Sequence, residues 1–222
     1  MKISLENGVT LHYEIQGEGP TLLLLHGNGE SGEVFYPLMD ALQKDFTCYA
    51  IDSRGHGRSS HHGEFFHYED LAEDIDLLIR ALHLQDVSIL GYSDGGIVGL
   101  LLAIQQKDYL KALIASGANL SPRDITPTWQ EHIANLAEAH PDNSLIQLMV
   151  NEPNIPRQDL KKIQIPVLYT CGRDGDIMEP EAYEALARLT PQGDVYVYEN
   201  AGHGEYVTHS TRLKPQVLAF LQ

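Results

Sequence analysis

Val87-Ser88-Ile89-Leu90-Gly91-Tyr92-Ser93-Asp94-Gly95 leads from a short apolar run into a segment of helical period that ends near Gln106. The pattern predicts a strand, a tight turn at G-x-S-x-G and a helix. A serine on such a turn projects its hydroxyl, and glycines beside it leave room for the backbone to bend sharply. The helix N-terminus then faces any negative charge that develops there. The stretch therefore indicates that Ser93 is presented as a nucleophile.

The alternation of short apolar runs and helical segments continues along the whole chain. It opens with an antiparallel pair around Asn7-Gly8, a strong hairpin signal. Further strands are expected at 21–25, 46–51, 87–90, 110–115, 165–170 and 194–198, and helices at 34–44, 68–84, 97–106, 181–189 and 211–221. Such alternation is typical of a parallel sheet covered by helices. We predict an α/β fold with a mostly parallel, twisted sheet of about eight strands and helices on both faces.

Residues 118–160 interrupt this alternation. Prolines punctuate two helical stretches there, at 129–139 and 144–150. Long insertions in compact domains are usually functional, so a short helical lid over the strand ends is expected; the alternative is a surface insertion without function. Apolar residues at helical spacing in it indicate either packing or a modest apolar pocket: Trp129, Ile133, Leu136, Leu145, Leu148 and Met149. Because no flexible linker divides the chain, a single domain over 1–222 is expected.

The composition limits the partners. With 31 acidic and 15 basic side chains the formal charge is −16, which repels nucleic acids and anionic membranes. The opening residues 1–6 do not form a signal-peptide core, and the longest aliphatic run, 22–25, is too short to cross a bilayer. These features predict a cytoplasmic protein with a small-molecule substrate. They do not predict whether the protein is a monomer or an oligomer. Cys48 and Cys171 are expected to be reduced, buried thiols, and no structural metal is expected.

Two later segments supply the partners that a serine nucleophile needs. Gly172-Arg173-Asp174-Gly175-Asp176 follows the strand expected at 165–170, and Ala201-Gly202-His203-Gly204 follows the strand expected at 194–198. Serine, aspartate and histidine in this chain order form one known type of triad. His203 lies between glycines, where a structural imidazole would have little to pack against. The position of the ring therefore favours a catalytic role.

Together these motifs resemble the α/β-hydrolase family of the esterase, lipase and C-C hydrolase type, nearly from end to end. Leu25-His26-Gly27-Asn28 is similar to the oxyanion loop of that family, and the segment 52–59 matches its D-x-R-G-H-G-x-S turn. The resemblance implies that Ser93 is the nucleophile and His203 the general base. It further implies that backbone N–H groups of Asn28 and Asp94 bind the oxyanion.

The resemblance does not decide which of two aspartates is the acid of the triad. Family members usually place it three residues after the glycine that corresponds to Gly172, but here that position is Gly175. Counting back from Pro191, and the pattern of residues 176–180, both favour Asp176. Asp174 is the alternative, and either residue could instead be a turn or capping carboxylate.

The activity that this resemblance implies is hydrolysis of a small ester through an acyl-enzyme, without a cofactor. A C-C bond hydrolase and a thioesterase on the same fold are alternatives, and so is a receptor that uses the fold without hydrolysis. A fourth alternative comes from residues 27–32, a literal G-x-G-x-x-G followed by Asp52, as in dinucleotide-binding oxidoreductases. Glu30 and Glu33 oppose this interpretation, since they place negative charge where a pyrophosphate would sit.

Other histidines have simpler explanations. His26 and His56 occupy the family motifs, but we expect them to tie loops together by hydrogen bonds rather than to take part in chemistry. His61, His62 and His67 could suggest a metal site. Because they lack ligand spacing and a set of cysteines or carboxylates, a solvated loop is the favoured interpretation.

Overall fold

The computed structural model describes residues 1–60 and 65–222 and contains one eight-stranded sheet. The strand order is β1-β2-β4-β3-β5-β6-β7-β8, in which β2 is antiparallel to β1 and β4, and the other pairs are parallel. The strands are β1 Lys2–Ser4, β2 Thr10–Gln16, β3 Thr21–Leu25, β4 Thr47–Asp52, β5 Val87–Tyr92, β6 Leu110–Ser116, β7 Val167–Gly172 and β8 Gly193–Tyr198. The predicted fold class is confirmed.

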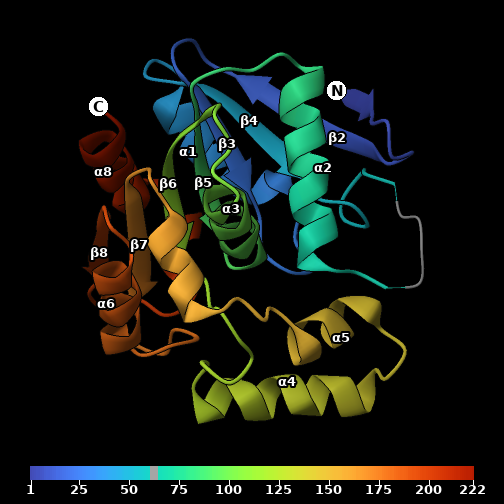
Figure 1. Cartoon of the computed structure of the whole chain (residues 1–222), viewed down its shortest axis with the longest axis vertical. Helices are drawn as coiled ribbons and strands as arrows, with labels where there is room; N and C mark the ends of the chain where they lie inside the picture. The colour runs from blue at the N-terminus through green and yellow to red at the C-terminus, as the bar shows by residue number, and fades with distance from the viewer. Residues whose placement is uncertain (61–64) are drawn as a thin grey trace.

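Helices cover both faces of the sheet. One hydrophobic cluster joins it to α2 (Tyr68–Ala81), α3 (Asp94–Ile104) and α6 (Pro180–Leu189). The other cluster joins it to η1 (Gly32–Phe35), α1 (Tyr36–Leu42), α7 (Glu205–Thr208) and α8 (Ser210–Leu221). In Figure 1, α2 and α3 lie in front of the sheet and α1 lies behind it. The leucine run of β3 is buried on both sides, since its side chains alternate between the two clusters.

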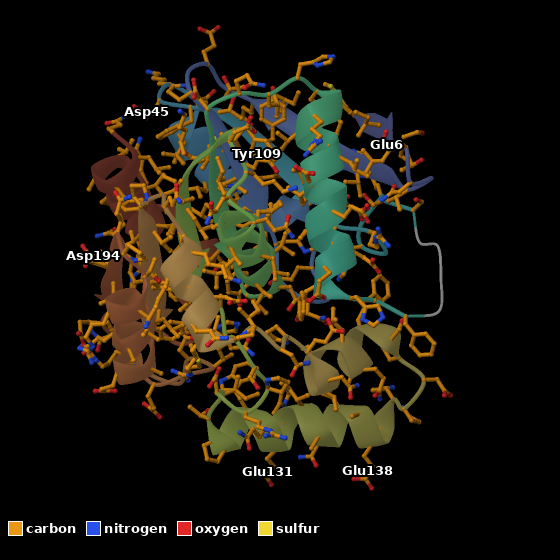
Figure 2. The ribbon with its side chains drawn as sticks, viewed as in Figure 1. Glu6, Asp45, Tyr109, Glu131, Glu138 and Asp194 are labelled. Carbon is orange, nitrogen blue, oxygen red and sulfur yellow. The ribbon has the colours of Figure 1, made fainter. Side chains whose placement is uncertain are left out.

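The 118–160 segment forms α4 (Pro127–Ala139) and α5 (Ser144–Asn151). These helices lie together at the bottom of Figure 1, beyond the sheet and next to the start of α2. None of the residues of α4 is buried, and Glu131 and Glu138 point away from the molecule in Figure 2. The segment therefore covers one end of the sheet, and its buried residues Ile125, Leu148 and Ile155 belong to the hydrophobic cluster that includes α2, α3 and α6.

Two short elements were not predicted from the sequence. They are η2 (Arg157–Lys162), a 3-10 helix, and α7, a single turn directly after His203. The helix expected at 34–44 is also divided, into η1 and α1. Turns of this length are too short to show a helical period, so sequence periodicity could not reveal them. Cys48 and Cys171 are buried and unpaired, as expected.

Candidate active site

Ser93 occupies a strained turn between β5 and α3. Its backbone has φ 51° and ψ −115°, which is rare for a residue with a side chain. A Cβ added to Gly91 would lie 2.1 Å from the carbonyl oxygen of Gly95, and one added to Gly95 would lie 2.1 Å from that of Leu25. Both glycines of the motif are therefore required by close backbone approach. The turn is the one that the sequence predicts.

His203 and Asp176 lie beside Ser93, in contact with one another. The distance from His203 Nε2 to Ser93 Oγ is 3.3 Å, and from His203 Nδ1 to Asp176 Oδ1 it is 2.8 Å. A carboxylate can only accept, so Nδ1 carries the hydrogen and Nε2 is left to accept from the serine hydroxyl. Asp174, the alternative acid, is exposed, and its backbone N–H donates to the carbonyl of Ala201. The structure brings Asp176, not Asp174, to the imidazole.

The carboxylate of Asp176 is buried and held by several donors. Its side chain is 0% exposed. The backbone N–H of Gly172 donates to Oδ2 at 2.6 Å, and that of Ile177 donates to Oδ1 at 2.7 Å. The hydroxyl of Tyr183 lies 3.4 Å from Oδ1. These bonds fix the carboxylate in the orientation that meets His203.

The expectation that the His203 ring has little to pack against was wrong. The ring centroid lies 5.0 Å from that of Tyr92 and 5.3 Å from that of Trp129, which meets it edge-on. Gly117, at φ +61°, packs against another side of the His203 ring. A Cβ added there would lie 2.6 Å from His203 Cε1, so only glycine leaves room for the ring. The loop that carries His203 looks open in sequence because its packing partners come from β5, α4 and the end of β6.

The residues predicted to bind the oxyanion lie on the loop after β3 and at the start of α3. A Cβ added to Gly27 would lie 3.1 Å from Ser93 Cβ, so the loop after β3 lies close to Ser93. Among the described residues, the backbone N–H groups of Asn28 and Asp94 have no protein acceptor. Unpaired N–H groups, one on the loop after β3 and one at the start of α3, are of the kind that can bind a developing oxyanion.

The side chains of these two residues bind each other. Asn28 Nδ2 donates to Asp94 Oδ2 at 3.0 Å and to the carbonyl of Leu145 at 3.1 Å. The hydroxyl of Tyr68 donates to Asp94 Oδ1 at 2.7 Å. Burial raises the pKa of the Asp94 carboxyl, although both hydrogen bonds act against that rise. The Asp94 side chain thus connects the start of α3 to the loop after β3 and to α2.

His26 and His56 tie loops together, as expected. The backbone N–H of Ser53 donates to His26 Nε2 at 3.0 Å, and that of Gly29 donates to His56 Nε2 at 3.1 Å. Burial lowers the pKa of His26 to about 4, so the ring is neutral at pH 7. Both rings accept from backbone N–H groups and so hold the oxyanion loop against the turn after β4.

The features that suggested a dinucleotide site serve other purposes here. Asp52 is buried, and its carboxylate accepts from the backbone N–H groups of Gly32 and Arg58, each at 2.8 Å. Glu30 turns back over the glycine loop, where Oε2 accepts from the N–H of Gly27 at 3.1 Å. Burial raises the pKa of Glu30. The Asp52 carboxylate already accepts two backbone hydrogen bonds, so it is not available to a ribose. A pyrophosphate on the glycine loop would lie against the carboxyl group of Glu30.

The histidine cluster falls partly outside the described residues, which exclude His61 and His62. His67 Nδ1 lies 2.6 Å from Glu152 Oε1, and this hydrogen bond raises the pKa of the ring. Within residues 1–60 and 65–222, no group of histidine, cysteine and acidic side chains is arranged to hold a metal ion.

A cavity of about 60 Å³ adjoins Ser93 and His203. That volume holds a few water molecules, or one small organic group. Three of the six apolar residues expected near a pocket line it, namely Trp129, Ile133 and Met149. Five further lining residues were not predicted from the sequence, namely Tyr68, Asn119, Ile125, Glu152 and Ile177. A signal existed for Asn119 alone, since it follows β6 at the carboxyl edge where α/β sites form.

Comparison with known proteins agrees with this fold. The family model described as alpha/beta hydrolase fold matches residues 20–158. The chain is 23% identical to a pimeloyl-[acyl-carrier protein] methyl ester esterase of Vibrio atlanticus, over 96% of this chain and 98% of that one. It is 29% identical to serine hydrolase BPHL of Mus musculus, over 97% and 84%.

The fold also matches solved structures. An esterase from Exiguobacterium antarcticum superposes with a TM-score of 0.87 at 19% identity, covering 99% of this chain and 98% of the other. In the part of the chain that the structure describes, no helix has the length and apolar character needed to cross a membrane. A sheet of this order, a serine on the turn after β5 and a matching family model over more than half its length make this chain a member of the α/β hydrolase fold family.

Proposed function

We propose that the protein is a serine hydrolase that cleaves small carboxylic esters through an acyl-enzyme. The observation that carries this proposal is the continuous chain of contacts from Ser93 Oγ through the His203 ring to the buried carboxylate of Asp176. A serine is a weak nucleophile unless a base removes its proton, and the base needs an orienting partner. The small cavity beside Ser93 supports a short acyl group.

The reaction follows from this arrangement. Ser93 Oγ attacks the ester carbonyl carbon while its proton passes to His203 Nε2, and the N–H groups of Asn28 and Asp94 receive the oxyanion. The C–O bond to the alcohol then breaks, and the alcohol leaves with the proton from Nε2. A water molecule gives a proton to Nε2 and attacks the acyl carbon. Ser93 regains its proton as the carboxylic acid is released.

We also propose that the 118–160 segment is a lid within a single domain, 1–222. Three hydrogen bonds tie it to the reactive groups. Trp129 Nε1 donates to the carbonyl of Gly175, the N–H of Thr126 donates to the carbonyl of Ile177, and Asn28 reaches Leu145. Two of these acceptors flank Asp176, so the position of α4 and the position of the acid depend on each other. A lid anchored in this way keeps water from the cavity.

The test compares the two candidate acids with p-nitrophenyl acetate as substrate. Asp176→Asn should lower kcat by on the order of 10³ to 10⁴, because the amide holds the wrong tautomer of His203. Asp174→Asn, the matched control two residues away, should retain the wild-type kcat. Ser93→Ala should abolish turnover. Equal rates for Asp176→Asn and Asp174→Asn, or full activity of Ser93→Ala in a pure sample, would contradict the proposal.

A further inference from the structure

A second cavity, of about 240 Å³, lies between α4 and α5, next to the cavity at Ser93. The two cavities share three residues, Ile125, Ile133 and Met149. These three residues, called the partition below, form a wall that both cavities share. The cavity at Ser93 is called the inner cavity and the second one the outer cavity.

The three partition residues differ in how freely they move. Ile125 is buried, and its carbonyl accepts from Gln130 Nε2 at 2.9 Å, while the next residue is bonded to Ile177. Ile133 is β-branched on a helix, which leaves one strongly preferred rotamer. Met149 lies on α5, is half-buried and has three rotatable bonds in its side chain. Met149 is the part of the partition that can swing aside at least cost.

The outer cavity suits a flexible apolar chain. Its remaining lining contains Pro122, Ala134 and Val150, with the exposed Arg123 and Gln130 where it meets solvent. No carboxylate lines the cavity, and its one charged lining residue, Arg123, is exposed, so an alkyl chain would not have to desolvate a buried charge. An alkyl group that entered it from Ser93 would pass Met149 and exchange water for carbon contacts.

We propose that the outer cavity is an acyl-chain subsite and that Met149 is its gate. This inference rests on the proposed esterase function. Short acyl groups then bind within the inner cavity with the gate closed. Medium-length acyl chains displace the Met149 side chain and extend between α4 and α5. The lid thus determines the range of chain lengths, with Met149 and Ala134 as the residues that set it.

The test measures kcat/KM for p-nitrophenyl octanoate divided by that for p-nitrophenyl acetate. Ala134→Trp fills the outer cavity from an exposed position of α4 and should lower this ratio about tenfold or more, because several methylenes lose their site. Met149→Ala removes the gate and should raise the ratio about fivefold. Asn135→Trp adds the same bulk at the next position of α4, outside the cavity lining, and should match the wild type.

The outcomes separate the two proposals. If the acetate and octanoate esters are both hydrolysed and Ala134→Trp gives the same ratio as Asn135→Trp, the acyl-chain subsite is wrong while the esterase function stands. The same conclusion follows if Met149→Ala leaves the ratio unchanged. If the wild type hydrolyses neither ester, the proposed function fails, and the subsite fails with it.

Discussion

Position 95 requires glycine because the neighbouring backbone leaves no room for a Cβ, and not only because glycine adopts conformations that other residues avoid. The backbone of α3 approaches β3 so closely that a Cβ here would lie 2.1 Å from the carbonyl oxygen of Leu25. Gly8 provides the contrast, since it has φ +86° but nothing within 4 Å of an added Cβ. A substitution at Gly8 therefore costs only backbone strain, whereas one at Gly95 requires α3 to move.

We expect Gly95→Ala to lower the free energy of unfolding by about 3 kcal/mol or more, because overpacking adds to backbone displacement. Gly8→Ala should cost about 1 to 2 kcal/mol, the strain of a left-handed residue with a side chain. Urea unfolding of both variants measures the difference. Similar losses for the two variants would show that the close approach at Gly95 is relaxed in solution.

The neutral His26 ring makes stability depend on pH. Burial lowers its pKa from 6.5 to about 4, so between these values the unfolded chain binds the proton and the folded chain does not. The contribution of the neutral His26 ring to the free energy of unfolding is therefore fully present above pH 6.5 and is lost as the pH falls toward 4. The loss amounts to about 3 kcal/mol at most.

Urea unfolding at several pH values tests this dependence. His26→Gln should flatten the fall in the free energy of unfolding between pH 6.5 and about 4. His83→Asn, which removes an exposed histidine at a position where φ is 53°, should leave the fall as in the wild type. If His26→Gln showed the same fall as the wild type, protonation of His26 would not be its cause.

At the scale of elements, α4 is attached to the core by few contacts. It buries no residue, and Trp129 Nε1 reaches across to the carbonyl of Gly175 at 3.1 Å. Trp129→Phe keeps an aromatic edge toward His203 but removes this donor. We expect amide hydrogen exchange in α4 to become about fivefold faster, which corresponds to about 1 kcal/mol for one hydrogen bond. Exchange in α3, measured in the same sample, is the internal control; unchanged exchange in α4 would contradict the anchoring role.

The elements also show why the sequence reveals some features and not others. The strands around Ser93 were predicted because buried parallel strands are near-continuous apolar runs, as in 21–25 and 87–90. Asp176 was favoured over Asp174 by a count along the chain, which a one-residue insertion could have shifted. Gly117, Tyr68 and Glu152 reach the site through long-range packing, and a single sequence has no local pattern that records such contacts.

At the scale of the whole molecule, the acidic side chains are spread around the periphery. Glu6, Asp45 and Asp194 lie in different places around the molecule in Figure 2, and Glu131 and Glu138 lie at the bottom, on α4. With a formal charge of −16 this distribution produces self-repulsion in the compact state. Raising the NaCl concentration from about 0.01 M to about 1 M shortens the screening length from about 30 Å to about 3 Å.

We therefore expect the Tm to rise by about 2 to 4 °C over that range, which corresponds to about 1 kcal/mol of relieved repulsion. Calorimetry in NaCl and, as the control, in KCl at equal ionic strength measures the effect. A Tm that stays constant or falls in both salts would mean that the surface ion pairs outweigh the repulsion, since salt screens both.

The proposed hydrolase activity depends on the activation of Ser93 by His203. A fluorophosphonate probe, followed by mass spectrometry of the digested protein, tests it most directly because the probe reacts with the activated hydroxyl and needs no known substrate. We expect one adduct, on Ser93, with none in Ser93→Ala and labelling slowed by on the order of 10³ in His203→Gln. An adduct on another residue, or labelling of Ser93 at the wild-type rate in His203→Gln, would contradict it.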